Sequence, residues 1–465
     1  MNATTTSKAV FAATIALVLM AAGCQSVEGT RQMTADILKE SVDKQNRAPG
    51  IVVGLIDKSG TKVVVARGKS GRGRAGEVDG DTIFEIGSIT KVFTTLLLQD
   101  MVDRGEVRLD DPIGKFLPAS VRTPIRDGRE ITLLDLATHT SGLPGLPGNL
   151  SPTDGDNPYA DYTVEQMYQF LSTCNLTRKI GSKFEYSNFG MGLLGHVLAL
   201  RAGTNYESLV VGRICGPLHM DSTRITLSTE MKLRLATGHS SVGPPVKYWD
   251  VPTLAGCGAF HSSANDLLKF LAANMEQSRS PLGSAMMKTQ TPLRRSGFLQ
   301  KVGLGWQIFA GIVWQNGGTG GFRSFIGFDG EGHGAVVLAN SANDIDEIGF
   351  NLLGSRYNLH KFSPPQQRVA ARIDHSVYDS YVGWYEFNAG QSMVITRDGD
   401  RLVARQSGRF ALDDAWPYEV FPGSETEFFY TAGDAQIKFV RNEAGAVTEM
   451  IVHQDGTDRK AVKLK

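Results

Sequence analysis

The sequence is poor in cysteine, with only four in 465 residues. Three of them, Cys174, Cys215 and Cys257, lie in the body of the chain, and such an odd, sparse set does not build a disulfide framework. No pair of cysteines has the spacing of metal ligands, and the nine histidines form no His-x-x-x-His or similar cluster. We therefore expect no metal and no other cofactor, and we expect the three cysteines to be buried as small hydrophobic residues.

The sequence also lacks an excess of charge of either sign. Lysine and arginine together number 48, as do aspartate and glutamate. This balance gives no reason to expect nucleic acid or an anionic membrane surface as a partner. Hydrophobic residues make up 41% of the chain and charged residues 21%, which is a globular composition. A chain of 465 residues is too long for one compact core, so we expect two or more folded units.

A long apolar run, Ala9–Ala22, follows a lysine close to the N-terminus. It is too short to cross a bilayer as a mature helix, but it fits the apolar centre of a secretory signal. The run ends in Ala-Ala-Gly-Cys, which resembles a bacterial lipoprotein box except for the alanine where leucine is usual. This resemblance implies a signal peptide over residues 1–23, a lipid on Cys24 and a tether over residues 24–32. The alternative is an ordinary cleaved signal, and both alternatives export the protein.

The next part of the chain is predicted to form one antiparallel sheet from two distant segments. A helix over Thr34–Lys44 precedes a β-hairpin formed by Ile51–Ile56 and Lys62–Ala66. After a long stretch of helices and loops, strand-like runs return at Leu304–Phe309, Ile312–Trp314, Ser324–Phe328 and Gly334–Leu338. A last helix carries apolar residues on one face, namely Ile345, Ile348 and Leu352. We predict an α+β domain over residues 33–357, an antiparallel sheet flanked by helices with an inserted all-helical subdomain.

The last part of the chain differs in character. A polar, proline-containing linker is predicted over residues 358–374. Short β-runs with turn signals between several of them follow, at Met393–Thr396, Leu402–Arg405, Glu427–Tyr430, Ile437–Val440 and Val447–Val452. This pattern predicts a C-terminal all-β domain over residues 375–465, a small barrel or a sandwich.

The motif Ser-x-x-Lys occurs three times, beginning at Ser41, Ser59 and Ser88. The first copy lies in the leading helix and the second in a hairpin turn, and neither offers a buried setting. The third opens a predicted helix, Ser88–Arg104, that is apolar nearly all round and is therefore expected to be buried. Burying Lys91 without a purpose is costly, and residues at positions i and i+3 share one helical face.

This setting predicts a nucleophilic serine. A desolvated lysine loses its charge and becomes a proton acceptor for the Ser88 hydroxyl. The helix N-terminus adds backbone amides and the positive end of the helix dipole. The alternative is that Ser88 only caps the helix while Lys91 extends its ammonium group to water.

Two later segments carry further polar groups. Tyr186-x-Asn188 is the one Tyr-x-Asn in the chain, and a tyrosine held near a lysine serves as a base or proton shuttle. The glycines of Trp314–Phe322 let the backbone approach a ligand closely, and a strand-edge amide there faces an oxyanion. No lysine follows the glycines, which disfavours a phosphate-binding loop. A polar loop and a glycine-rich turn without function are the alternatives.

In this order, the three motifs resemble those of the serine β-lactamase and penicillin-binding protein superfamily, in its class C branch. Other stretches are similar to the family as well, including Phe84–Gly87, Asp110–Ile113, His139–Pro144 and Gly256–Leu267. The similarity extends over roughly Asp36–Tyr357. The segment after Ile373 resembles the lipocalin-like β-barrel domains of some D-aminopeptidase-like and esterase-like members.

The resemblance implies the roles of the site residues. Ser88 is then the nucleophile, Lys91 and Tyr186 exchange protons, and Asn188 contacts a substrate amide. The backbone amides of Ser88 and Gly318 form the oxyanion hole.

One position departs from the family pattern. Gln315 begins a Gln-Asn-Gly where the family has Lys-Thr-Gly or His-x-Gly, so a cation that attracts a substrate carboxylate is missing. A charge-assisted contact contributes roughly 1.5–3 kcal/mol against about 1 for a neutral one, which argues against strong β-lactamase activity. Arg323, close in sequence, either supplies the missing charge or is an ordinary surface residue.

From these observations we predict an exported bacterial serine hydrolase, periplasmic or anchored as a lipoprotein. It would form an acyl-enzyme with β-lactams, D-amino-acid peptides or small esters. The alternatives are a penicillin-binding sensor or scaffold with poor turnover, and a carboxylesterase. The expected partner is a small-molecule or peptide substrate, with membrane contact only through the lipid.

Overall fold

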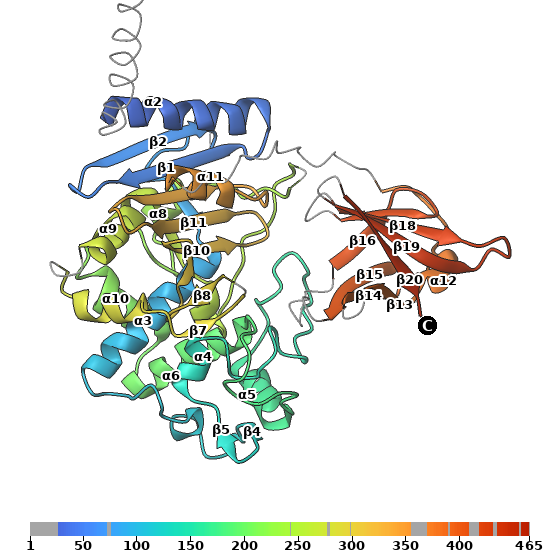
Figure 1. Cartoon of the computed structure of the whole chain (residues 1–465), viewed down its shortest axis with the longest axis horizontal. Helices are drawn as coiled ribbons and strands as arrows, with labels where there is room; N and C mark the ends of the chain where they lie inside the picture. Colours follow the sequence, from blue (N-terminus) through green and yellow to red (C-terminus); the bar gives the residue numbers. More distant parts are fainter. Residues whose placement is uncertain are drawn as a thin grey trace, which may run out of the picture.

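The computed structural model describes residues 27–71, 76–241, 243–276, 280–297, 299–354, 370–388, 391–408, 418–430, 435–454 and 457–464. Figure 1 shows a larger body of helices and sheet and a smaller β-barrel formed by the C-terminal part of the chain. The predicted signal peptide, Cys24 and most of the predicted linker lie outside the described residues.

The larger body contains an eight-stranded antiparallel sheet in the order β2-β1-β12-β11-β10-β9-β8-β7. Its strands are β1 (Gly50–Ile56), β2 (Lys62–Gly68), β7 (Arg294–Arg295), β8 (Lys301–Val302), β9 (Gln307–Phe309), β10 (Ile312–Gly318), β11 (Arg323–Phe328) and β12 (Gly334–Ala339). Because β1 pairs with β12, the N-terminal hairpin and the last strands form one sheet, which confirms the predicted topology. Strand β10 is longer than predicted, since Gly317 and Gly318 still pair with Ser324 and Arg323.

The longer helices of this body are α2 (Val27–Leu38), α3 (Thr90–Asp103), α5 (Val164–Thr173), α6 (Asn188–Ala202) and α9 (Ala264–Met275). Shorter ones are η1 (Lys39–Lys44), η2 (Gly87–Ile89), η3 (Ile113–Lys115), α4 (Leu133–Ala137), α7 (Tyr206–Val210), η4 (Val211–Cys215), α8 (Thr229–Arg234), η5 (Ala255–Cys257), α10 (Gly283–Thr289) and α11 (Asp346–Leu352). Two small ladders, β3 (Ile83–Glu85) with β6 (His261–Ser263) and β4 (Ile125–Arg126) with β5 (Arg129–Glu130), complete the body. Helix α2 begins earlier than predicted. The sequence did not indicate this start, because the first turns carry mostly exposed residues without apolar periodicity.

A hydrophobic core covers each face of the sheet. In β1 the side chains of Ile51, Val53 and Leu55 belong to one core, and those of Val52 and Ile56 belong to the other. This alternation follows from the two-residue repeat of a strand. The first core also contains side chains of α2 and α11, and the second contains side chains of α3 and α9.

Helix α3 is buried from Thr90 to Met101, as its apolar sequence predicts. Its polar side chains have partners inside the fold: the Thr94 hydroxyl lies 2.6 Å from the Tyr206 hydroxyl. Ser88 precedes the α-helix and lies in the 3-10 turn η2, which the chain enters through a Gly87 with φ of 47°. The α-helix predicted to begin at Ser88 therefore begins two residues later, at Thr90.

The C-terminal part of the chain closes into a barrel of strands β13 to β20, which confirms the barrel-like alternative. The strands are β13 (Gly383–Asn388), β14 (Gln391–Asp398), β15 (Arg401–Gly408), β16 (Tyr418–Pro422), β17 (Glu427–Tyr430), β18 (Ala435–Arg441), β19 (Val447–Gln454) and β20 (Thr457–Lys463). The short helices η7 (His375–Val377) and α12 (Tyr378–Tyr381) precede them. The barrel has its own hydrophobic core, which includes Tyr381, Tyr385, Ile395 and Phe439.

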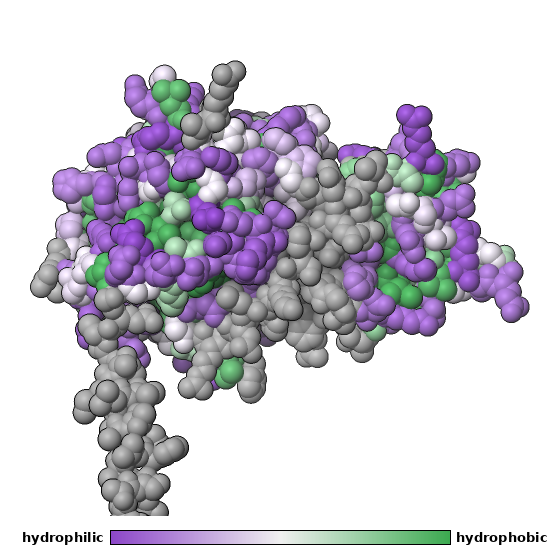
Figure 2. All heavy atoms as spheres, turned by 90° about the horizontal axis from the view of Figure 1, so that it is seen from above, coloured by the Kyte–Doolittle hydropathy of each residue, from purple (hydrophilic) through white to green (hydrophobic). Residues whose placement is uncertain are grey.

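The surface of the described residues is mixed. Figure 2 shows one face, on which hydrophilic residues cover most of the area and hydrophobic ones form separate patches. Within the described ranges, no helix has both the length and the apolar character needed to cross a membrane. Cys215 and Cys257 are buried as predicted, whereas Cys174 is half-buried.

Candidate active site

Ser88 lies between two side chains that exchange protons in many enzymes. Its Oγ is 2.8 Å from Lys91 Nζ and 2.8 Å from the Tyr186 hydroxyl. Ser88 is half-buried, while the residues on both sides of it are buried. The structure thus brings Tyr186, from a second motif, to the Ser88–Lys91 pair, although Tyr186 lies 98 residues beyond Ser88 in the sequence.

Lys91 is fully buried and is held by three oxygen atoms. Besides Ser88 Oγ, its Nζ donates to Asn188 Oδ1 at 2.8 Å and to the backbone carbonyl of Cys257 at 2.6 Å. These contacts come from η2, α6 and η5, so three elements meet at one nitrogen atom. They provide the hydrogen bonds that a buried amine requires.

The position of Tyr186 follows from the start of α6. Ser187 is the N-cap of this helix and accepts the Gly190 amide at 2.8 Å. Tyr186 is therefore the residue before the N-cap, and Asn188 is the first residue of the helix. Both side chains reach the Ser88–Lys91 pair from this corner of the chain.

His139 begins the family-like stretch His139–Pro144, and the sequence predicts no role for it. Its ring stacks on that of Tyr186, with centroids 4.6 Å apart, and its Nδ1 accepts the Ser187 amide at 3.0 Å. Burial, together with the charge of Lys91, lowers the pKa of His139 to about 3. The imidazole is thus neutral at ordinary pH, and the stack orients the Tyr186 ring.

The end of β10 lies against η2. A Cβ atom on Gly87 would be 2.7 Å from the amide nitrogen of Gly318, and one on Gly317 would be 2.9 Å from that of Ser88. Only glycine allows backbone to approach backbone so closely, which explains glycine at both positions. The amides of Ser88 and Gly318, which the resemblance assigns to the oxyanion hole, therefore belong to neighbouring segments.

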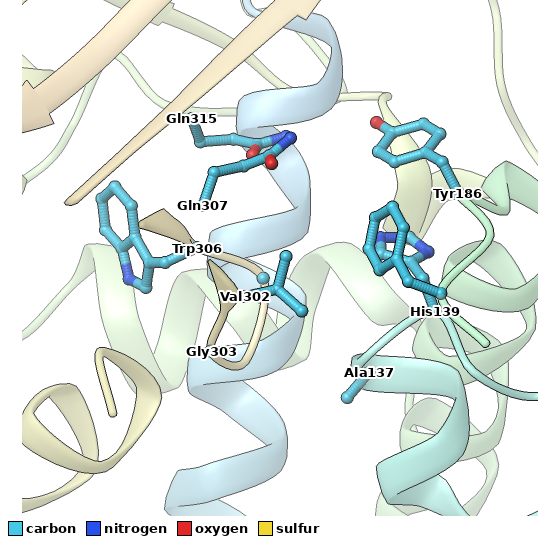
Figure 3. A pocket seen from close by; sticks show the side chains of 10 residues that line it. Ala137, His139, Tyr186, Val302, Gly303, Trp306, Gln307 and Gln315 are labelled. Atoms are coloured by element: carbon cyan, nitrogen blue, oxygen red, sulfur yellow. The ribbon is translucent and has the colours of Figure 1, made fainter. Parts of the chain in front are cut away.

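A pocket opens beside these groups, between the β8–β10 edge and the Tyr186 corner. Figure 3 shows Tyr186 and His139 on one wall and Gln315, Gln307 and Trp306 on the other. The remaining lining residues are Ala137, Phe184, Val302, Gly303 and Gly305, so among the residues that the structure describes no Asp, Glu, Lys or Arg lines the pocket. Gln315 is buried, and its amide nitrogen lies 3.5 Å from the Ser88 carbonyl.

Arg323 lies on the other face of β10. Strand alternation puts Gln315 and Gly317 on the Ser88 face and Asn316 and Gly318 on the face of α11. The guanidinium of Arg323 occupies the space above Gly318 on that second face and donates to the carbonyls of Thr319 and Phe322. Arg323 is thus close to the site, but its guanidinium lies on the other face of β10 from Gln315 and does not replace the charged side chain that the family has at that position.

Glu85 is a second group without a role in the sequence predictions. It ends β3, is buried, and accepts hydrogen bonds from the Thr319 hydroxyl at 2.5 Å and the Trp249 amide at 2.7 Å. Burial raises its pKa to about 7, against the two hydrogen bonds, which lower it. The sequence did carry one indication that Glu85 has a role, since this glutamate lies between the apolar residues Phe84 and Ile86.

The other two Ser-x-x-Lys copies have no such surroundings. Ser41 is buried in η1, but Lys44 is exposed and pairs with Glu40. The Ser59 hydroxyl is exposed and lies 2.5 Å from Asp57 Oδ1 in the β1–β2 turn. Neither serine has a buried lysine beside it.

The described residues contain one group of side chains close enough together to share a metal ion. It consists of Asp329, Glu331 and His333, which lie in the turn before β12 and are mostly exposed. Such exposed acidic turns are common without a metal, and this group is not part of the pocket.

Comparison with known families and proteins gives a consistent result. Residues 30–350 match the family model described as Beta-lactamase, and residues 367–463 match a domain of unknown function, DUF3471. The D-alanyl-D-alanine-carboxypeptidase/endopeptidase AmpH of Escherichia coli (strain K12) is 30% identical over 338 residues, which is 66% of this chain and 86% of AmpH. Penicillin-binding protein 4* of Bacillus subtilis (strain 168) is 26% identical over 425 residues, or 83% of this chain and 88% of that protein.

Solved structures resemble the larger body. The β-lactamase/D-alanine carboxypeptidase of Yersinia pestis, complexed with citrate, superposes with a TM-score of 0.63 at 26% identity, covering 71% of this chain and 98% of that one. A class C β-lactamase from Rhodobacter sphaeroides gives a TM-score of 0.60 at 26% identity, with 69% and 97% covered.

We predict that Ser88 is the one residue that a fluorescent penicillin acylates and that a fluorophosphonate phosphonylates. Of the three Ser-x-x-Lys serines, it alone has a buried lysine and a tyrosine at hydrogen-bond distance. Intact-mass spectrometry should show one adduct, which Ser88→Ala abolishes and the control variants Ser41→Ala and Ser59→Ala retain. An adduct that survives in Ser88→Ala would contradict this assignment.

Proposed function

This chain belongs to the β-lactamase family of serine hydrolases, and we propose that it is exported and forms an acyl-enzyme at Ser88 with uncharged acyl substrates. One observation carries the proposal: the Ser88 hydroxyl lies 2.8 Å from both Lys91 Nζ and the Tyr186 hydroxyl. A nucleophile with a base at this distance is the arrangement that acyl transfer requires.

Two groups are placed to accept the proton of Ser88. A neutral Lys91 amine donates its two N–H groups to Asn188 and the Cys257 carbonyl, and its lone pair then faces Ser88 Oγ. A charged Lys91 donates its third N–H to Ser88 instead, and an ionised Tyr186 then takes the proton. Both alternatives use the same contacts, and both leave Lys91 and Tyr186 as the acid–base pair.

The reaction then proceeds in two steps. Ser88 Oγ attacks the acyl carbon, the bond to the leaving group breaks, and the proton taken from Ser88 passes to the leaving atom. The amides of Ser88 and Gly318 donate to the oxygen that becomes negative during attack. In the second step water gives a proton to the same pair and attacks the acyl carbon, the bond from that carbon to Ser88 Oγ breaks, Ser88 takes the proton back, and the carboxylic acid is released.

The pocket supports a preference for uncharged substrates. The described residues that line it include no lysine or arginine, His139 is neutral, and Gln315 stands where the family has a cation. A substrate carboxylate would lose water there without gaining a charged partner, which is unfavourable. We propose small esters as the better substrates, and β-lactams and D-amino-acid peptides as weaker ones.

Restoring a cation tests this preference. Gln315→Lys should lower KM for carboxylated β-lactams by roughly tenfold, since about 1.4 kcal/mol is regained from one charge-assisted hydrogen bond. Neutral p-nitrophenyl esters should gain little. Steady-state kinetics with nitrocefin, a p-nitrophenyl ester and a D-Ala-D-Ala peptide measure the change, and Gln307→Lys, which adds a charge elsewhere in the pocket, is the matched control.

Other outcomes point to other functions. If Arg323→Ala raises KM for carboxylated substrates while Gln315→Lys has no effect, Arg323 supplies the cation and the uncharged-substrate proposal is wrong. An acylation burst without steady turnover on all three substrates would indicate a penicillin-binding sensor or scaffold instead of a hydrolase.

Export and anchoring are proposed from the N-terminal sequence, with relatives that include penicillin-binding protein 4* as support. We expect the expressed protein to fractionate with membranes and to incorporate labelled palmitate through Cys24, because lipid chains attached there would insert into the bilayer. Cys24→Ser should remove both signals. A Cys24→Ser variant that is exported and fractionates like the parent would contradict lipidation.

A further inference from the structure

Glu85 connects three segments of the active site. It lies three residues before Ser88, at the end of β3, and is almost completely buried. Its Oε2 accepts the hydroxyl of Thr319 at 2.5 Å, and its Oε1 accepts the backbone amide of Trp249 at 2.7 Å. Both distances lie in the range of hydrogen bonds to an ionised carboxylate.

Thr319 is the residue that follows Gly318, so Glu85 acts next to the oxyanion hole. The Thr319 amide donates to the Phe322 carbonyl at 3.1 Å and closes the turn between β10 and β11. A second link joins the same two segments, because the Ser324 hydroxyl donates to the Ile86 carbonyl at 2.8 Å. The chain before Ser88 is therefore tied to the β10–β11 hairpin through side chains on both sides of its turn.

We propose that ionised Glu85 is a positioning residue that holds the Gly318 amide opposite Ser88 through the Thr319 hydroxyl. This inference rests on the proposed function, since the hole matters only if Ser88 is acylated. A carboxylate accepts from Thr319 and Trp249 at once. A protonated carboxyl must donate one hydrogen, which weakens one of the two links and lets the turn shift.

Few charged groups surround Glu85. Across the β3–β6 ladder, His261 Nε2 lies 4.0 Å from Glu85, but burial lowers its pKa to about 4, so it is neutral above that pH. Asp250, beside Trp249, raises the pKa of Glu85 further, although burial is the larger cause. On the hairpin side, Arg323 donates to the Thr319 carbonyl.

The pKa of Glu85 determines the direction in which pH should change the rate of Ser88 acylation. Since the pKa of Glu85 is raised to about 7, the carboxylate forms as pH rises through neutrality. Acylation of Ser88 should then become faster over the same interval. The contribution of Glu85 is the part of the pH step that disappears when Glu85 is replaced.

The experiment measures the rate constant of Ser88 phosphonylation by a fluorophosphonate, and kcat and KM for a neutral ester, from pH 5.5 to 9. The variants are Glu85→Gln and Thr319→Val, which remove the charge and the hydroxyl. Thr319→Ser keeps the hydroxyl and serves as the rescue. Thr34→Val removes a buried hydroxyl of α2, which bonds to the Thr30 carbonyl, and serves as the control.

At pH 8 we expect Glu85→Gln and Thr319→Val to be slower by roughly tenfold, in kcat more than in KM, because a misplaced donor weakens transition-state binding. Near pH 5.5 they should approach the wild-type rate, while Thr319→Ser and Thr34→Val follow the wild type throughout. The proposal is overturned if both variants keep the wild-type step. It is also overturned if they lose rate equally at every pH, as a structural role predicts.

These outcomes are separate from failure of the proposed function. If the Ser88→Ala variant is phosphonylated like the wild type, the acyl-enzyme at Ser88 is wrong. If the wild type is labelled only at Ser88 but the pH profiles of all variants coincide, only the role of Glu85 is wrong. Thr319→Val keeps the test valid should Glu85→Gln fail to fold.

Discussion

The active site depends on the burial of one lysine side chain. Lys91 lies in the apolar helix α3 with none of its surface exposed, and an amine in such a place needs oxygen partners for its hydrogens. The structure supplies them from Ser88, Asn188 and the Cys257 carbonyl. Meeting this requirement fixes the relative positions of the turn before α3, the start of α6 and the short helix η5.

The remaining parts of the site are arranged around that point. Tyr186 reaches Ser88 because Ser187 begins α6 next to it, and His139 keeps the tyrosine ring in place by stacking. On the opposite side, β10 approaches η2 so closely that only glycine fits at Gly87 and Gly317. The Gly318 amide comes from the β10–β11 strand pair and the Ser88 amide from η2, so both are held by the fold, which suits a hole that must be formed before the reaction starts.

The sequence predicted those site residues whose surroundings are formed by their neighbours in the chain. Ser88 and Lys91 could be distinguished from two other Ser-x-x-Lys copies because the apolar residues of α3 already indicate burial. His139 and Glu85 could not be assigned, since their roles arise from contacts with residues more than forty positions away, such as Ser187 and Thr319. The one local signal for Glu85 was a charged residue inside an otherwise apolar strand.

In the fold, too, features set by neighbouring residues were predictable and features set by distant contacts were not. The sheet built from both ends was predictable from strand-like runs, but the extension of β10 through its glycines was not, because pairing with β11 decides it. In the barrel, β13, β16 and β20 were missed. Strand β20 carries many charged residues and β16 ends in proline, so barrel closure outweighs their weak local preference for strand.

The most direct test of this account is the reactivity of Ser88 when the amine of Lys91 is replaced by an uncharged group of similar length. In Lys91→Met, the account predicts that phosphonylation of Ser88 at pH 8 slows by roughly 10²–10⁴-fold, the usual contribution of a positioned acid or base. Lys44→Met, which alters the lysine of another Ser-x-x-Lys copy, should react like the wild type. A folded Lys91→Met protein whose Ser88 is phosphonylated at the wild-type rate would contradict the account.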